Sequence, residues 1–392
     1  MLATAPLPPS PAWRVGVFYA LLFLVSGASL PYLPVWLRAQ GLSGAEIGVV
    51  LSLPLLARLV TGPAVAIWAD SFRERRTPLI ILAGVAAGAY GALSLAERFE
   101  AIALCWFLGA TAAAGILPLT DVIGLKIAQR YGTSFGRPRS AGSAAFVAAN
   151  LGLGTALTVG PPWWVLAWMI AAAALTAVAA ASILPREPVR SDGGLEAGMG
   201  RLRGLGDLLR RPRFLLVIVS AGLIQAAHGF YYGFSTLVWR EQGLSEAATG
   251  LLWAAGVAAE IVFLWTSEWW RGRLGAERLL LLSGAAAVLR CAVAALGPPL
   301  PVLAPLQLLH ALTFAGAYVA ATRLVDAATP PESASAAHTL SASLQSGLFI
   351  GLATLASGAL YDLTGAGGYL AMAAVAAAGT GGALLIVRGA AS

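Results

Sequence analysis

Charged residues are scarce in this chain of 392 residues. Asp, Glu, Lys and Arg together make up 11% of it, whereas 58% of the residues are hydrophobic and the mean hydropathy is +0.79. In ordinary soluble domains about a quarter of the residues are charged. The scarcity therefore excludes an ordinary soluble protein and indicates that a lipid bilayer forms part of the environment of this chain.

Cysteine and the motifs of soluble chemistry are equally sparse. Both cysteines, Cys105 and Cys291, fall inside apolar runs, so we expect buried apolar residues and neither a disulfide nor a metal site. The chain lacks the GxxxxGKS/T, HExxH, GxSxG and CxxC patterns, which disfavours an ATP-driven pump. We expect no cofactor and no enzymatic activity, and a membrane-embedded enzyme is the alternative from another class.

What the chain has instead is a series of apolar runs. A helix needs about 20 residues to cross roughly 30 Å of hydrocarbon. Polar breaks delimit twelve windows of that kind, at 15–37, 46–69, 77–96, 99–125, 141–160, 163–184, 214–238, 248–268, 279–297, 302–325, 339–362 and 367–388. They predict an all-α membrane protein with twelve transmembrane helices in two six-helix bundles, over 1–184 and 214–392, joined by a cytoplasmic hinge over 185–213.

The cations of the chain lie mainly on alternate links between these windows. The net charge of +7 could suggest nucleic acid, but the Lys and Arg residues form no continuous basic face. Cytoplasmic loops retain Lys and Arg. An N-terminus in the cytoplasm leaves only Arg38, Arg98 and Arg240 on the other side. We therefore predict a multi-pass protein of the inner (cytoplasmic) membrane with both termini in the cytoplasm and no nucleic-acid partner.

A short internal repeat favours two similar halves. The segment RAQGLSGAEIG begins at Arg38, and REQGLSEAATG begins 202 residues later at Arg240. The same offset aligns Arg58 with Glu260, so the two halves carry opposite charges at equivalent depths. Coincidence in a chain rich in Ala and Leu is the alternative, but the shared QGLS favours duplication.

These features resemble the major facilitator superfamily over essentially the whole chain. The resemblance is carried by six plus six spans around a basic hinge, by the repeated QGLS turns and by the link DSFRERR over 70–76, which lacks the usual glycine. A narrower resemblance to the phenylpropionate permease branch, related to the lactose and nucleoside proton symporters, is carried by several motifs. They are PYLPVWLRAQGLS (31–43), PLTD (118–121), FGRPRSAGSAAF (135–146), FSTLVWREQGLS (234–245) and GALYDLTG (358–365).

The resemblance implies alternating access, in which two bundles rock about a central site. That site would be lined mainly by helices 1, 4, 7 and 10, and the transport would be driven by a proton gradient. Members of this branch handle unlike molecules, so the resemblance does not define the substrate.

Ionisable side chains inside or beside the predicted spans are candidates for coupling and gating. A charge at the bilayer centre costs about 2.5 to 3.5 kcal/mol on insertion scales, so each one needs a partner or a task. A buried carboxylate can load and release a proton as water access alternates between the two sides. The candidates for proton coupling are Glu260, Arg290 and Asp121, and those for gating are Asp70, Arg73 and Arg323. A structural ion pair that only fixes helix packing is the alternative role.

Polar side chains on the predicted cavity helices are candidates for substrate binding. Gln225 and His228 lie three residues apart on one face of the seventh span, and Tyr232 follows. Together they could hold an aromatic or polyhydroxyl ligand by stacking and hydrogen bonds. The alternative is a hydrogen-bonded histidine in a helix interface. Further candidates for substrate contacts are Arg58, His310 and Tyr32.

These observations together predict a secondary active transporter. We expect it to import a small organic solute, namely an aromatic acid, a nucleoside or a sugar, by alternating access coupled to protons. A drug or metabolite efflux antiporter is the nearest alternative. We expect its partners to be the small-molecule substrate, protons and the lipid bilayer, and we expect the protein to be a monomer.

Overall fold

The computed structural model describes residues 10–187, 189, 205–330 and 333–391, and within them the regular elements are all helices. The prediction of an all-α protein is therefore confirmed. The first half contains α1 (Ala12–Ala39), α2 (Gly44–Asp70), α3 (Arg76–Leu93), α4 (Phe99–Tyr131), α5 (Gly136–Leu157) and α6 (Trp164–Ser182). The second half contains α8 (Leu205–Leu208), α9 (Pro212–Ala226), α10 (His228–Glu241), α11 (Glu246–Leu274), α12 (Ala276–Ala294), α13 (Leu300–His310), η1 (Ala311–Gly316), α14 (Ala317–Ala328), α15 (Ala334–Ser343), η3 (Leu344–Phe349), α16 (Ile350–Thr364), η4 (Gly365–Gly367) and α17 (Gly368–Ala391).

Helical segments long and apolar enough to cross a membrane recur along the whole chain. Ten of them occur in the described part, by length and composition. One, Pro212–Glu241, contains both α9 and α10, and another is a continuous stretch of 54 residues, Ala336–Gly389. A helix satisfies its own backbone hydrogen bonds, so these apolar segments can lie in a bilayer without a cost from unpaired N–H and C=O groups.

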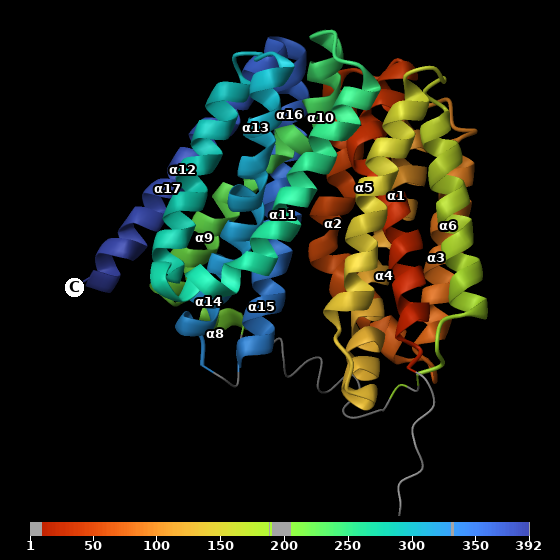
Figure 1. Ribbon diagram of the computed structural model, residues 1–392, viewed down its shortest axis with the longest axis horizontal. Helices are drawn as coiled ribbons and strands as arrows, with labels where there is room; N and C mark the ends of the chain where they lie inside the picture. Colours follow the sequence, from red (N-terminus) through yellow and green to blue (C-terminus); the bar gives the residue numbers. More distant parts are fainter. Residues whose placement is uncertain (1–9, 188, 190–204, 331–332, 392) are drawn as a thin grey trace, which may run out of the picture.

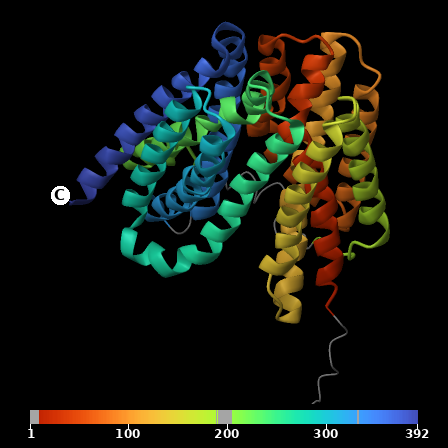
Figure 2. The ribbon, with the colours of Figure 1, turned by 45° about the horizontal axis from the view of Figure 1, so that its top comes forward.

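The helices pack in two groups that lie side by side (Figure 1). In one group α1 to α6 pack against one another, and in the other α9 to α17 do so. The main contacts between the groups are α2 with α16, α5 with α11, and α1 with α10. Figures 1 and 2 both show the groups meeting at the top and diverging toward the bottom. We call the top, around residues 41–48, 154–160, 241–250 and 358–365, the closed end, and the opposite side the open end.

The QGLS repeat has the same structure in both groups. Gly41 and Gly243 have positive φ angles, 87° and 83°, a conformation that glycine adopts without steric cost. The next helix then begins with a serine cap: Ser43 Oγ accepts from the N–H of Glu46 at 3.2 Å, and Ser245 Oγ accepts from the N–H three residues on, also at 3.2 Å. The repeat seen in the sequence is thus also a structural repeat.

A carboxylate and several glycines join the two groups at the closed end. Asp362, in α16, accepts hydrogen bonds at 2.8 Å from the backbone N–H groups of Gly44 and Ala45, which open α2. It thereby pairs N–H groups that have no partner within their own helix. Between α5 and α11, a Cβ at Gly250 would collide with the carbonyl oxygen of Asn150. The absence of a side chain there allows the two helices to touch.

Three of the predicted spans are interrupted. The seventh, 214–238, is divided at Ala227 into α9 and α10. The tenth and eleventh, 302–325 and 339–362, each contain a π-helical segment, η1 and η3. Hydropathy detects that a span is apolar but does not report a change in its hydrogen-bond pattern. Segments of π-helix are rare and frequently lie at functional sites.

The glycine contact at the closed end makes a testable prediction. We expect Gly250→Leu to force α5 and α11 apart and to lower the free energy of unfolding by about 1–3 kcal/mol, as overpacking does. Gly84→Leu is the matched control, because a Cβ at Gly84 in α3 meets open space. The measurement is the melting temperature of each purified variant in detergent. Equal melting temperatures for the two variants would contradict the role of this contact.

Candidate functional site

A buried guanidinium is the centre of a polar cluster in the second group of helices. Arg290 of α12 is 6% exposed. It donates from Nη2 to Gln307 Oε1 at 2.8 Å, and its Nη1 lies 3.5 Å from Nδ1 of His310. Its guanidinium carbon lies 4.1 Å from the centre of the Tyr231 ring. Within the described residues no carboxylate forms an ion pair with Arg290, so neutral dipoles and a ring face stabilise its charge.

His228, at the start of α10, lies beside this cluster. Its Nδ1 is 3.1 Å from the carbonyl oxygen of Gln225, and its Nε2 is 3.1 Å from the Thr313 hydroxyl of η1. Because a carbonyl can only accept, Nδ1 carries a proton and donates it to Gln225. The imidazole stacks on Tyr232 with ring centres 5.6 Å apart and meets His310 edge-on at 5.3 Å. The structure thus brings His228 together with His310 and Arg290, which the sequence singled out separately.

Aromatic rings extend the cluster along both sides. Tyr231 stacks on Trp253 of α11 at 4.5 Å, and His310 stacks on Phe314 at 5.4 Å. The Gln225 side chain turns toward the same region and donates to the Phe314 carbonyl at 3.3 Å. Sequence reasoning missed Trp253 as a member of this cluster. The signal was its position within the predicted span 248–268, because a tryptophan that only anchors a helix at the membrane surface lies at the end of a span. Such flat faces can stack on a planar ligand.

The first group carries a second polar cluster, built on Asp121 of α4. The Tyr19 hydroxyl of α1 donates to the Asp121 carboxylate, and Nε of Arg139 lies 3.9 Å from the same carboxylate oxygen. The Arg139 guanidinium also lies over the ring of Phe23, 4.5 Å from its centre. Asp121, a predicted coupling residue, is thus held by a phenol and a cation of its own group.

Arg139 is the functional candidate that sequence reasoning missed. The predicted fifth span began at 141, which left Arg139 among the loop cations. The structure begins α5 at Gly136, so Arg139 lies inside the helix. The motif FGRPRSAGSAAF contained the signal that Arg139 could lie inside the helix, because a run of small residues follows this cation directly. Arg139 pairs with Asp121, and its helix α5 packs on α11, which carries Glu260, across the boundary between the groups.

Glu260 and Arg58, which the repeat aligns, are both half-buried. In the described part of the chain neither forms an ion pair with the other or with any other residue. Glu260 lies one helical turn along α11 from Gly256, where a Cβ would be 3.5 Å from His310 of the aromatic cluster. Arg58 lies beside η3, since a Cβ at Gly347 would be 3.8 Å from the Cβ of Arg58. Among the described residues both charges are therefore without an ion-pair partner.

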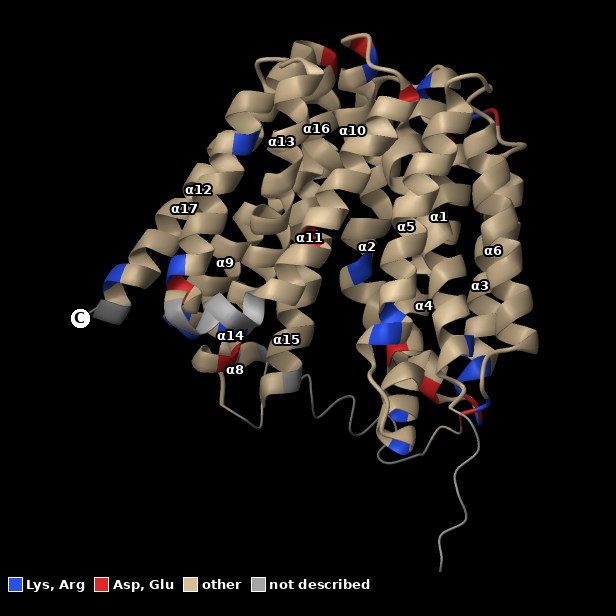
Figure 3. Cartoon of the chain, in the orientation of Figure 1, with Lys and Arg blue, Asp and Glu red and all other residues tan. Residues whose placement is uncertain are grey.

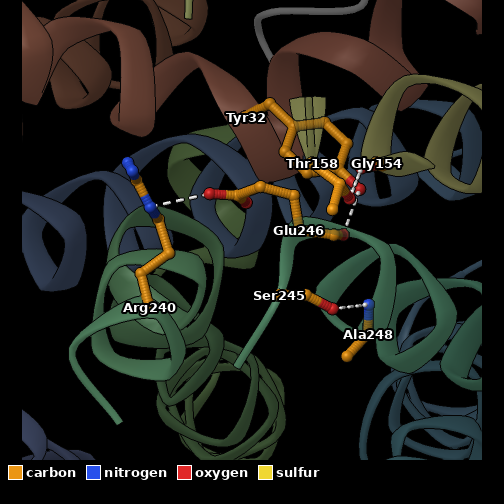
Figure 4. A network of polar contacts seen from close by, with 7 residues as sticks. All are labelled: Tyr32, Gly154, Thr158, Arg240, Ser245, Glu246 and Ala248. Carbon is orange, nitrogen blue, oxygen red and sulfur yellow. Dashed lines mark hydrogen bonds and ion pairs between the residues drawn. The ribbon is translucent and has the colours of Figure 1, made fainter. Parts of the chain in front are cut away.

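Tyr32 lies in the closed end, where Figure 4 shows it among residues of both groups. The side chain is fully buried and its hydroxyl donates to the Asn150 carbonyl at 2.8 Å. The same hydroxyl lies 3.5 Å from the backbone carbonyl of Glu246, whose carboxylate pairs with Arg240 at 2.7 Å. Its hydrogen bonds thus join helices of the two groups, while contact with a substrate stays a prediction.

The predicted gating residues lie in the opposite half of the molecule. Asp70 pairs with Arg75 at 3.5 Å, and Arg73 beside them is exposed. Arg323 in α14 is exposed as well. Gating stays a prediction for all three.

The beginning of the predicted hinge, 185–213, is attached to the first group. Glu187 is 3% exposed, and its two carboxylate oxygens accept from Arg130 of α4 at 2.9 and 3.0 Å. Its carbonyl accepts from the N–H of Arg75 at 2.8 Å. Residues 188 and 190–204 of the hinge lie outside the described residues. The N–H of Val189 also donates to the Arg73 carbonyl at 3.0 Å, so the described start of the predicted hinge packs on the first group.

Comparison with known proteins agrees with this architecture. The model of the MFS_1 like family matches residues 12–370. The chain belongs to this family. The probable 3-phenylpropionic acid transporter of Escherichia coli (strain K12) is 30% identical over 369 residues, which are 91% of this chain and 93% of that protein. The maltose permease of Geobacillus stearothermophilus is 32% identical over 291 residues, 72% of this chain and 71% of that protein.

Solved structures of major facilitator transporters share the fold. The nucleoside transporter NupG superposes with a TM-score of 0.85 at 17% identity, covering 96% of this chain and 99% of that one. An inward-facing, unoccupied bacterial homologue of the human lysosomal transporter Spinster gives a TM-score of 0.74 at 15% identity, covering 98% of both chains. The MFS_1 like chain is therefore a multi-pass membrane transporter of small solutes and not an enzyme, as its sequence predicted.

The contact between Arg290 and Gln307 predicts opposite effects on stability for removing the acceptor and for then removing the cation. In Gln307→Leu the buried charge stays but loses its strongest acceptor, which costs about 1.5–3 kcal/mol of unfolding free energy. Adding Arg290→Met removes the charge and with it the unmet demand for an acceptor. We therefore expect the double variant to melt at a higher temperature than Gln307→Leu alone. A double variant that melts lower would mean that Arg290 is stabilised by other contacts.

Proposed function

We propose that this transporter is a proton-coupled importer of a small aromatic solute. The observation that carries the proposal is the position of Glu260. This half-buried carboxylate has no ion-pair partner among the described residues, and it lies on α11, which packs on α5 of the other group and contributes Trp253 to the aromatic cluster. A carboxylate in that position can take up a proton on one side of the membrane and release it on the other as access alternates.

The topology that we propose has twelve crossings. The stretch Ala336–Gly389 has 54 residues, and as helix it would be about 80 Å long, so it would cross twice. The 19-residue helix α12 carries Glu277 and Arg278 near one end and Arg290 near the other, and would cross once. Figure 3 supports cytoplasmic termini in the inner membrane, because Lys and Arg gather mainly at the lower, open end. The structure would then be the state open to the cytoplasm.

The proposed transport cycle consists of rocking between the two groups of helices. Residues 1–184 and 214–392 would move as two bundles, with 185–213 joining them. Opening the closed end would separate Asp362 from the N-terminus of α2 and Gly250 from Asn150. A single chain contains both bundles, so we propose that the protein acts as a monomer.

An aromatic acid is the substrate class that we propose. Tyr231 and Trp253 are buried, whereas the ring of Tyr232, which stacks on Trp253, is half-buried and can offer a flat surface. Arg139 makes one ion pair, through Nε, within the described residues, which leaves its Nη groups for a carboxylate. Among the relatives, the Escherichia coli protein is named as a probable 3-phenylpropionic acid transporter. We therefore propose that Arg139 binds the carboxylate and that Tyr232 stacks on the aromatic group.

Replacing Glu260 tests the proton coupling. In proteoliposomes with an imposed pH gradient, we expect Glu260→Gln to abolish accumulation of 3-phenylpropionate but to retain its exchange in the absence of a gradient, because the variant cannot release a proton. Glu277→Gln, at the start of α12, is the control and should accumulate the acid as the wild type does. Gradient-driven accumulation by Glu260→Gln would show that another group carries the proton.

Replacing Arg139 tests the substrate class. We expect Arg139→Gln to weaken binding of 3-phenylpropionate by about tenfold to a hundredfold, because a charge-assisted hydrogen bond contributes about 1.5–3 kcal/mol. Binding of the uncharged 3-phenylpropionamide should change little. The exposed Arg137 provides the control variant Arg137→Gln. Equal weakening of the acid and the amide in equilibrium binding would exclude a role for Arg139 in reading the carboxylate.

A further inference from the structure

A groove of about 400 Å³ lies in the first group, between the beginnings of α1 and α5. These two helices pack on each other, and Figures 1 and 2 both show them side by side. They end beside the closed end, at Ala39 and Leu157, so they begin at the open end. The groove therefore lies at the open end, where Lys and Arg gather in Figure 3.

The groove faces away from the boundary between the two groups. Arg137, which lines it, is exposed, whereas Arg139 is turned toward Asp121. Residues two positions apart in a helix are rotated by about 200°, so the two arginines leave α5 on nearly opposite sides. On α1, Trp13 is 61% exposed and Val17 is 40% exposed. Large apolar side chains exposed on the outside of a transmembrane helix contact lipid, so the groove opens to the bilayer.

Most of the groove is apolar and lined by small residues. Gly16 and Ala20 line it from α1, and Pro138 and Ala141 line it from α5. A Cβ at Gly16 would lie only 3.6 Å from the Cα of Pro138, so the two helices approach closely beneath the groove. Trp13 borders the same groove at the start of α1, the position in which tryptophan anchors a helix at the membrane surface. The apolar part can accommodate a hydrocarbon chain that runs along the two helices from this surface.

The end of the groove nearest the helix starts is positively charged. Within the described residues neither Arg137 nor Arg14 forms an ion pair, and the Arg14 guanidinium carbon lies 5.6 Å from the centre of the Trp13 ring. Neither α1 nor α5 has an acidic residue in its first turn, and Phe135 provides no side-chain cap for α5. The first N–H groups of a helix carry partial positive charge and attract anions. This end of the groove therefore favours a negatively charged group.

We propose that the groove binds one anionic phospholipid, of the phosphatidylglycerol type. Its phosphate accepts from the Arg137 guanidinium, and one acyl chain packs along Gly16, Ala20 and Ala141. The order of charged and apolar parts in the groove matches this amphipathic molecule, because a soluble anion would leave the apolar part uncovered and a neutral lipid would leave the arginine unpaired. In the topology proposed above, the lipid belongs to the cytoplasmic leaflet.

The test of charge recognition is lipid binding to the purified full-length protein in detergent, followed by native mass spectrometry. The probes are dioleoylphosphatidylglycerol and the zwitterionic dioleoylphosphatidylcholine, and we expect tighter binding of the first. Arg137→Gln should weaken binding of the phosphatidylglycerol about fivefold, the effect of one basic residue beside an anionic headgroup, and should change the phosphatidylcholine little. Arg98→Gln is the matched control, because Arg98 is exposed at the start of α4, beside the closed end.

The apolar part of the groove has its own pair of variants. Ala141→Phe fills the groove from α5 and leaves Arg137 in place, so it should weaken binding of the phosphatidylglycerol more than tenfold. Ala144→Phe is the control, because Ala144 is exposed on the same helix and does not line the groove. Glycerol 1-phosphate, which has the phosphate but no acyl chain, should not displace the lipid at equal concentration.

Three results would overturn the proposal. The first is equal affinity for the two lipids in the wild type. The second is wild-type affinity for the phosphatidylglycerol in Ala141→Phe with an unchanged melting temperature, which decides even if Arg137→Gln fails to fold. The third is displacement of the lipid by an equal concentration of glycerol 1-phosphate, which would indicate a site for soluble anions. These measurements need neither a transported solute nor a pH gradient, so the lipid site and the proposed transport succeed or fail separately.

Discussion

Water is absent from the hydrocarbon core of a bilayer, so each backbone N–H and C=O group there needs a partner within the protein. Continuous helices supply those partners, and the apolar runs of the described chain are helical for this reason. The backbone departs from this pattern at Ala227, η1 and η3. Side chains provide partners at two of these places: His228 binds the carbonyl of Gln225, and Gln225 binds the carbonyl of Phe314. Irregular backbone and polar side chains therefore occur together.

The same constraint acts on charges, and the two groups of helices meet it differently. In the first group Arg139 is paired with Asp121, and Tyr19 adds a hydrogen bond. In the second group Arg290 is held by the neutral side chains of Gln307, His310 and Tyr231. Glu260 has no ion pair among the described residues. Two halves with the same QGLS turns thus differ in how their buried charges are neutralised, as the proposed division between substrate binding and proton coupling requires.

Much of the fold could be predicted because apolar length and turn chemistry are local properties. The windows 46–69 and 279–297 lie within a few residues of α2 and α12, and the serine caps after Gly41 and Gly243 follow directly from the QGLS motif. The site was less predictable. Arg139 was assigned to a loop because a cation lowers local hydropathy, although its charge is balanced inside the structure by Asp121, eighteen positions earlier on another helix.

The sequence by itself determined that this protein is helical and crosses a membrane, since twelve apolar runs with few charges can be buried only in lipid or in one another. It also identified His228, Arg290 and His310 as unusual, because polar residues within such runs are costly. Only the tertiary structure decided that these three side chains meet, that Arg290 is held by Gln307 and that the amide oxygen of Gln225 has no donor among the described residues. Those contacts join residues from separate helices, and their distances depend on how the helices pack, which no local pattern encodes.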